Sequence, residues 1–403
     1  MVSNKPILKN ILSIGSARAI SMLFSLLILP YLINQIGIAQ YGVIVFALAF
    51  VAYFKTLVNF SFNITAVRSI STQQKDLKQV NIIVNEIINT KLFLLLFSTI
   101  LGLTVILVVP NFNAHLSIFL IIFSTLIGYA LYPEWFFIGT ERMEYIALLM
   151  ISFKILHVIS VFLFINNPTD SYVYAIILSA EQLLLAITGL ILMYRKFKMR
   201  WITIPFSKIR NQLRANSALF MNQLLPNLFN NTATLLLGLF HGPAITGTFG
   251  IIRKFTNPGK NVLKIVSRVF FPAINRNPEN ASTFRSVQWK ITFVVMITIG
   301  AIAPFLSIIF KGIDESIAIP LMILASGIIG LTLYDIYGDN YFLVKHEDQL
   351  VLKNTFIFSI LGFIAAFPVI YFGGLLGAVS IVAGTQIAIG SRLFVIYKRN
   401  QHQ

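Results

Sequence analysis

Apolar runs long enough to cross a lipid bilayer follow one another along the chain, separated by short polar connections. A helix spans the hydrocarbon core with ~20 residues, and we mark twelve such runs in the sequence. Because they are continuous rather than alternating over segments of about ten residues, they predict helices. The predicted spans are 12–34, 42–65, 83–109, 115–137, 144–166, 171–194, 215–240, 247–273, 285–310, 317–342, 350–372 and 375–397.

Basic residues are concentrated in every second connection. Lysines and arginines lie near both ends of the chain and after spans two, four, six, eight and ten, whereas the other connections hold only Lys311. Cytoplasmic loops of membrane proteins are enriched in Lys and Arg. We therefore expect both termini on the cytoplasmic side.

The longest connection divides the chain into two halves of six spans. It covers 195–214 and is basic, which predicts a cytoplasmic linker between an N-lobe, 1–194, and a C-lobe, 215–403. The segments Gly37–Gly42 and Gly242–Gly247 resemble each other, and their ungapped alignment puts Lys55 opposite Lys260. Halves with the same topology are related by an axis along the membrane normal. The predicted fold is an all-α integral membrane protein with two six-helix lobes and a pseudo-two-fold axis.

Composition agrees with this picture and excludes several classes of protein. Of the 403 residues, 57% are hydrophobic and 11% are charged, against about 25% charged in soluble domains. The net charge of +17 follows largely from the basic loops, so we expect no nucleic-acid partner. Cysteine is absent, the five histidines have no metal-binding spacing, and there is no P-loop. We expect no metal and, because the outer connections are short and poor in carboxylates, no enzyme.

Five cations lie on the eighth predicted span without an acidic residue beside them. A charge at mid-bilayer is costly, so this stripe should face a water-filled cavity or an anion. Pro258 and Gly259 lie in the middle of the span and predict a kink or hinge. The cations are Arg253, Lys254, Lys260, Lys264 and Arg268.

Two more cations and three acids inside the spans have two interpretations each. Arg18 and Lys55 either line the same cavity or reach the interface or a local ion pair. A buried carboxylate either binds a coupling H⁺ or Na⁺ or neutralises an intramembrane lysine. The acids are Glu181, Asp335 and Asp339.

Amide side chains surround Pro226 in the seventh span. They could hydrogen-bond sugar hydroxyls or hold helices together. The candidates for sugar contacts are Asn222, Asn227 and Asn230.

The segment Tyr132–Met143, YPEWFFIGTERM, carries a family resemblance. It is similar to the signature of Wzx-type O-antigen flippases, in the polysaccharide-transporter branch of the multidrug/oligosaccharidyl-lipid/polysaccharide exporter superfamily. Leu29–Leu32 and the segment Gly37–Gly42 also resemble that family. The signature residues Glu134, Trp135 and Glu141 have a simpler interpretation, which is maintenance of the fold.

The resemblance implies a flippase for undecaprenyl-pyrophosphate-linked oligosaccharide repeat units in the bacterial inner membrane. It also implies a cationic central cavity and alternating access. The family's intramembrane cations match Arg18, Lys55, Arg253, Lys254 and Lys260 by position and type only.

The leading hypothesis is therefore a flippase whose partners are the lipid-linked oligosaccharide, membrane lipids and other polysaccharide assembly proteins. One alternative is a multidrug-type antiporter of the same superfamily, which would need an acidic or neutral cavity. The other is a membrane glycan polymerase, which would need a long catalytic outer loop. No cofactor is expected beyond a coupling H⁺ or Na⁺.

Overall fold

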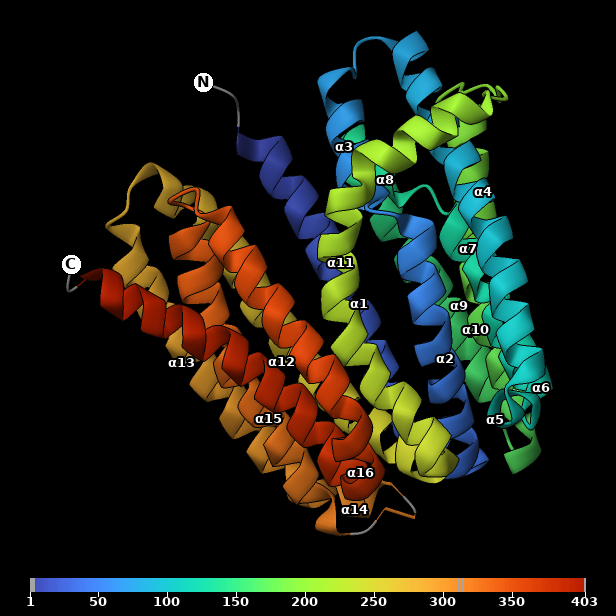
Figure 1. Ribbon diagram of the computed structural model, residues 1–403. Helices are drawn as coiled ribbons and strands as arrows, with labels where there is room; N and C mark the ends of the chain where they lie inside the picture. Colours follow the sequence, from blue (N-terminus) through green and yellow to red (C-terminus); the bar gives the residue numbers. More distant parts are fainter. Residues whose placement is uncertain (1–3, 311, 314, 402–403) are drawn as a thin grey trace. The chain divides into compact units, whose positions relative to one another are not determined.

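A computed structural model describes residues 4–310, 312–313 and 315–401, and it describes the backbone alone for 4–13, 222, 225–229 and 315. Every long element in this part of the chain is helical (Figure 1). This confirms the prediction of an all-α membrane protein. The main helices are α1 (Asn4–Ile36), α2 (Ile38–Asn59), α3 (Phe62–Thr72), α4 (Leu77–Val108), α7 (Thr125–Leu131), α8 (Glu134–Gly139), α9 (Met143–Phe164), α10 (Ser171–Ile191), α11 (Phe206–Phe240), α12 (Gly242–Arg276), α13 (Asn280–Ile302), α15 (Ala318–Leu333), the π-helix η5 (Tyr334–Phe342) and α16 (Asp348–Gln401).

Within the described residues, nine helices are long and apolar enough to cross a membrane. One of them, α16, joins two helices across a kink at Gly374, whose φ of 52° is left-handed. This kink lies where the sequence separates its last two spans. The polar helices α11 and α12, each 35 residues long, are not among the nine. They occupy the seventh and eighth predicted spans, so about twelve spans are present.

Several predicted spans are interrupted or extended. The second ends at Asn59, and α3 begins after Ser61, whose φ is 64°. The fourth is divided into α6 (Leu116–Phe123), α7 and the start of α8. The tenth ends in the π-helix η5, whose wider turns satisfy backbone groups five residues apart.

Contacts between helices divide the chain into two compact units. The first comprises Met1–Ile36 and Phe50–Leu224, and the second comprises Gly37–Ala49 and Leu225–Gln403. The first half of α2 thus packs with the C-terminal helices. The predicted lobes, 1–194 and 215–403, and the axis between them stay a prediction.

In the first unit, the connection before α11 is held against α4. Residues 206–214 already belong to α11, so the non-helical part is 197–205. Asn81 and Asn85, one turn apart on α4, bind its backbone: Asn81 Oδ1 accepts from Arg200 N at 2.7 Å and Asn85 Oδ1 from Ile202 N at 2.8 Å. Asn85 Nδ2 donates to Arg200 O at 2.8 Å. These asparagines fix the segment in one register along the helix.

The segment Tyr132–Met143, called the family-like segment because it resembles the flippase signature, packs against α3. Trp135, Phe136 and Phe137 are buried. A Cβ on Gly139 would lie 2.8 Å from Cβ of Ile70, so α8 approaches α3 where only glycine fits. These contacts agree with a role in maintaining the fold.

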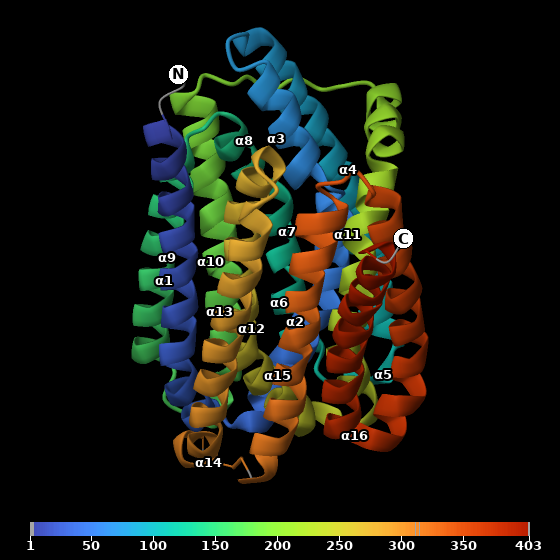
Figure 2. The ribbon, with the colours of Figure 1, turned by 90° about the vertical axis from the view of Figure 1, so that its left-hand side faces the viewer.

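In the second unit, α12 lies beside α13, α15 and α16 (Figure 2). The helices α15 and α16 touch at their backbones, since a Cβ on Gly390 would lie 2.1 Å from the carbonyl oxygen of Gly330. Small residues permit such close contact between membrane helices. The helices α15 and α16 beside α12 therefore form a tightly packed pair.

Candidate anion-binding pocket

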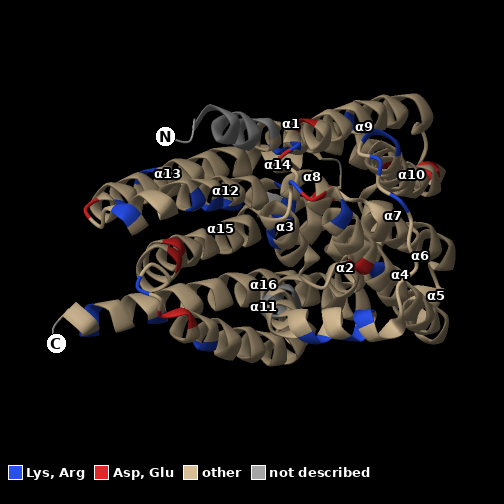
Figure 3. Ribbon diagram, turned by 90° about the horizontal axis from the view of Figure 1, so that it is seen from above, with Lys and Arg blue, Asp and Glu red and all other residues tan. Residues whose placement is uncertain are grey.

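The basic residues of α12 form a row because of their spacing. Side chains three, four and seven positions apart project from the same side of an α-helix. Figure 3 shows the Lys and Arg positions along α12. The row on this face consists of Arg253, Asn257, Lys260, Asn261 and Lys264.

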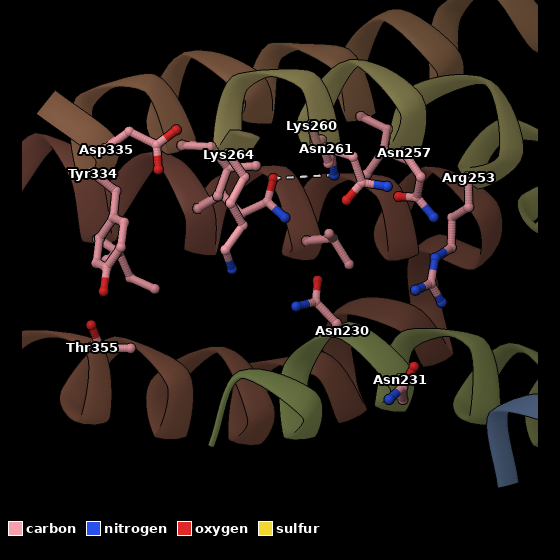
Figure 4. Close-up of a pocket in the computed structure, with 15 residues that line it drawn as sticks. Asn230, Asn231, Arg253, Asn257, Lys260, Asn261, Lys264, Tyr334, Asp335 and Thr355 are labelled. Atoms are coloured by element: carbon pink, nitrogen blue, oxygen red, sulfur yellow. Dashed lines mark hydrogen bonds between the residues drawn. The ribbon is translucent and has the colours of Figure 1, made fainter. Parts of the chain in front are cut away.

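This row lines a cavity of about 450 Å³ that lies entirely within the second unit. Figure 4 shows the cationic and amide side chains of α12 facing Asn230 and Asn231 of α11. Further polar walls come from η5 and α16. They are Tyr334, Asp335, Thr355 and Gln386.

Arg253 is held in place by a buried hydroxyl group. Its Nη1 donates to Oγ1 of Thr234 at 2.8 Å, and Thr234 is 1% exposed. Its guanidinium carbon lies 5.8 Å from the centre of the Phe249 ring. Arginine has five N–H donors, and the bond to Thr234 uses one. The anchored guanidinium can therefore donate hydrogen bonds to the oxygens of a carboxylate or a phosphate in the cavity.

Lys260 lies near the middle of α12 and is half-buried. Its Nζ donates to Oε1 of the buried Gln386 at 3.3 Å. An ammonium group has three donors and no acceptor. The bond to Gln386 orients the lysine and leaves donor capacity for an anionic group.

Asp335 forms the acidic wall of the cavity and is held by two amides. Its Oδ2 accepts from Nε2 of Gln288 at 2.9 Å, and its carbonyl oxygen accepts from Nδ2 of Asn340 at 2.8 Å. Asn340 also donates to Oγ of Ser267 on α12 at 2.8 Å. Asp335 is 6% exposed, so its position is fixed by hydrogen bonds and packing. It is the one carboxylate among the side chains that line this cavity in the described part of the chain, whose other charged groups are Arg253, Lys260 and Lys264.

The structure brings five of the predicted site residues together in this pocket. Four others lie outside its lining: Lys254 is an exposed neighbour of Arg253, Asp339 follows Asp335 in η5, and Pro258 and Gly259 lie within α12. The five that line the cavity are Asn230, Arg253, Lys260, Lys264 and Asp335. Their role in binding stays a prediction.

The segment around Pro258 is helical, and α12 runs without interruption from Gly242 to Arg276. A Cβ on Gly259 would lie 2.3 Å from Cγ1 of Val295, so this glycine permits close packing of α12 on α13. A hinge at Pro258 and Gly259 stays a prediction. The side chains of the predicted sugar contacts Asn222 and Asn227 lie outside the described part of the chain.

Arg18 and Lys55 belong to the first unit, where each has its own partner. Arg18 Nη2 lies 3.0 Å from Oε1 of Glu134 in the family-like segment. Lys55 Nζ lies 3.8 Å from the centre of the Tyr129 ring, and the buried Lys91 donates to the carbonyl oxygen of Tyr129 at 3.2 Å. Tyr129 thus holds two lysines by two different contacts.

Glu181 also lies in the first unit, between two basic side chains of α9. Its Oε2 is 2.8 Å from Nδ1 of His157 and 3.4 Å from Nζ of Lys154. In this arrangement the carboxylate neutralises a lysine inside the membrane, which is one of the two interpretations that the sequence allows. Binding of a coupling ion is the other.

Sequence reasoning missed five polar residues of the pocket wall. Asn257 and Asn261 follow the same helical spacing as the cations, and that spacing could have identified them. Tyr334 directly precedes the predicted Asp335. Thr355 and Gln386 lie more than ninety residues beyond Lys264 along the chain, and no local pattern marks them.

The fold and the pocket define a multi-pass membrane protein with a cationic cavity. Its fold is shared with known transporters. A lipid II flippase, MurJ, in an inward closed conformation matches with a TM-score of 0.76 and 14% identity, over 95% of this chain and 87% of that one. An inward-facing multidrug resistance MATE family transporter of the MOP superfamily matches with a TM-score of 0.61 and 14% identity, over 94% and 90%.

Residues 7–278 match the family described as "Polysaccharide biosynthesis protein". Since this is more than half of the chain, the protein belongs to that family. Proteins of Escherichia coli (strain K12) and Shigella dysenteriae, both named "Putative O-antigen transporter", are each 23% identical. The alignments cover 98% and 94% of this chain and 97% of each relative.

Proposed function

We propose that this protein is a transporter, not an enzyme, and that it flips undecaprenyl-pyrophosphate-linked oligosaccharide repeat units across the bacterial inner membrane. The oligosaccharide would be a unit of O-antigen or a similar surface polysaccharide. The observation that carries the proposal is the pocket of the second unit, where three cations and several amides share one cavity. Pyrophosphate needs basic partners, and sugar hydroxyls need amide partners.

The comparisons support the same substrate class. The two relatives are named for O-antigen transport, and the MurJ structure is titled a lipid II flippase. In the proposed cycle, Arg253, Lys260 and Lys264 hold the pyrophosphate while the lipid tail remains in the bilayer. Alternating access would then expose the pocket to each side in turn, with both termini of the chain cytoplasmic.

A multidrug antiporter would share this fold, as the MATE match illustrates. A cationic drug requires a neutral or acidic cavity, however, because like charges repel in a site of low dielectric. Here three cations and one carboxylate line the pocket. Its charge favours an anionic substrate.

The test is deletion and complementation in the native strain, followed by assignment of the undecaprenyl-linked repeat unit to one leaflet. Loss of surface polymer with repeat units retained on the cytoplasmic side is expected for a flippase. Repeat units that reach the outer face but stay unpolymerised would instead identify a polymerase. Partners among the other assembly proteins would be sought by crosslinking in the same strain.

The driving ion is also part of this proposal. H⁺ or Na⁺ would bind at Asp335, Asp339 or Glu181, the carboxylates inside spans. Transport by a variant carrying Asp335→Asn and Asp339→Asn should lose its dependence on an imposed ion gradient. A dependence equal to that of the wild type would remove both residues from this role.

A further inference from the structure

We infer that Asp335 is a release residue, a carboxylate that limits how tightly the pocket holds an anionic headgroup. The inference rests on the proposed function, because it concerns the same cavity. A carrier must both bind and release its cargo, and three cations acting on one pyrophosphate would favour binding alone. A fixed negative charge in the same wall shortens the residence of the anion.

The position of Asp335 suits this role. It lines the cavity together with Lys260 and Lys264, yet neither ammonium group forms an ion pair with it within 4 Å in the described structure. The carboxylate therefore does not cancel one lysine by direct contact. It lowers the positive potential of the whole cavity, which a phosphate entering among the cations would experience as repulsion.

The carboxylate is also fixed. Gln288 of α13 donates to Oδ2 of Asp335 and, with the same nitrogen, to the carbonyl oxygen of Leu263 on α12 at 3.3 Å. Gln288 is 0% exposed. The carboxylate is thus tied to Gln288 of α13, and Gln288 is tied in turn to α12, so a buried amide holds Asp335 in the wall of the cavity.

The charged surroundings of Asp335 allow its contribution to be isolated. Asp339 and Tyr334 face it from its own element, and Lys264 and Arg268 face it from α12. The element α13 contributes the neutral Gln288, and α16 contributes the neutral Thr355 and Gln386 to the same wall. Glu279, which directly precedes α13, bears the same charge, is exposed and lies outside the lining of the cavity. It is a matched control.

The experiment measures binding of geranyl pyrophosphate to the purified full-length protein by titration calorimetry. At pH 8, Asp335→Asn should bind about tenfold more tightly than the wild type, the effect of one charge several ångströms away at an effective dielectric of about 20. Glu279→Gln should stay within about twofold of the wild type, since the charge of this exposed side chain is screened by water and salt. Asp335→Glu, which restores the charge, should return the affinity to the wild-type value.

The pH dependence separates this role from a structural one. As pH falls, the wild-type carboxylate becomes protonated and loses its charge, whereas asparagine does not change. The ratio of the two affinities should therefore shrink toward one at low pH, and protonation of the pyrophosphate itself cancels in that ratio. An Asp335→Asn variant that binds no more tightly than the wild type overturns the inference, as does an equal gain in Glu279→Gln.

Failure of the proposed function would look different. In that case the wild type would not bind the probe, or Lys260→Ala would leave its affinity unchanged. Wild-type binding that depends on Lys260, together with no gain in Asp335→Asn, would overturn the release role alone. If Asp335→Asn fails to fold, Asp335→Ser takes its place in the same affinity comparison, because it also removes the charge and keeps a polar side chain.

Discussion

Gly42 and Gly247 cross so closely that neither position has room for a side chain. A Cβ on Gly42 would lie 1.8 Å from the carbonyl oxygen of Pro243, and one on Gly247 would lie 2.4 Å from the carbonyl oxygen of Ile38. The two contacts are reciprocal, since each residue of the first segment corresponds to one 205 positions later. Gly37 and Gly242, which precede the two helices, both have a φ of 80°. The first turns of α2 and α12 thus have equivalent backbones and equivalent contacts.

Alanine at either crossing glycine should destabilise the protein. The added methyl group meets backbone atoms, which cannot rotate away, so Gly42→Ala or Gly247→Ala should each cost about 1–3 kcal/mol of the free energy of unfolding. The measurement is thermal unfolding of the purified protein followed by intrinsic fluorescence. The control is Gly384→Ala, because a Cβ there meets no atom within 4 Å. Unfolding temperatures that are the same for all three variants would contradict the crossing geometry.

The similarity between the two segments was visible in the sequence, but the close contact between the helices that they begin was not. Six similar residues and the pair Lys55 and Lys260 predicted equivalent helices. The alignment could not show that Gly37–Ala49 packs with the C-terminal helices, since it compares segments and does not place them in contact. Close backbone crossings depend on which helices meet, and this is decided by the whole chain.

Removing the two central cations of the pocket should abolish flipping. Arg253→Ala and Lys260→Ala together remove charge-assisted contacts of about 1.5–3 kcal/mol each, which is a loss of more than a hundredfold in affinity for a pyrophosphate. Surface glycan should disappear while protein abundance in the membrane stays at the wild-type level, as judged by immunoblot. Lys254→Ala is the control, because this neighbouring lysine does not line the cavity. Normal surface glycan in the double variant would refute the role of this pocket.

The cations of the pocket were predictable because helical spacing is local, whereas the opposite wall was not. Arg253, Lys260 and Lys264 lie within a single helix, so one period of 3.6 residues places them together. Gln386 reaches Lys260 from α16, across a separation in sequence of 126 residues. That contact depends on how α15 and α16 pack at their glycines. No pattern within either helix encodes it.

The hydroxyl group of Thr234 should matter for binding through Arg253. Thr234→Val keeps the shape of the side chain but removes the acceptor at 2.8 Å, leaving the guanidinium less well anchored. A guanidinium that is less well anchored loses more conformational freedom when it binds an anion, so affinity for geranyl pyrophosphate should fall severalfold. The matched change is Thr246→Val, since the Thr246 hydroxyl donates to Gly242 of its own helix and does not line the pocket. Equal affinities in the two variants would show that Arg253 is positioned by packing alone.

The two interpretations of Glu181 make opposite predictions for a double variant. Glu181→Gln leaves Lys154 and His157 without their carboxylate, and removing one partner of a buried ion pair is strongly destabilising. The unfolding temperature should therefore drop. Lys154→Met in the same protein removes the stranded charge and should restore most of the loss, because the cost of a broken buried ion pair comes mainly from the charge left without a partner.

Transport by this double variant then decides between the two roles. If Glu181 only neutralises Lys154, the stable double variant should flip its substrate with unchanged dependence on an imposed ion gradient. If Glu181 binds the coupling ion, the variant should be stable but indifferent to the gradient. Asp335→Asn measured in parallel provides the comparison, since that residue lies in the pocket of the other unit. Two basic side chains lie within ion-pair distance of Glu181, at 2.8 Å for His157 and 3.4 Å for Lys154, which is an arrangement that neutralises a carboxylate. We therefore expect the first outcome.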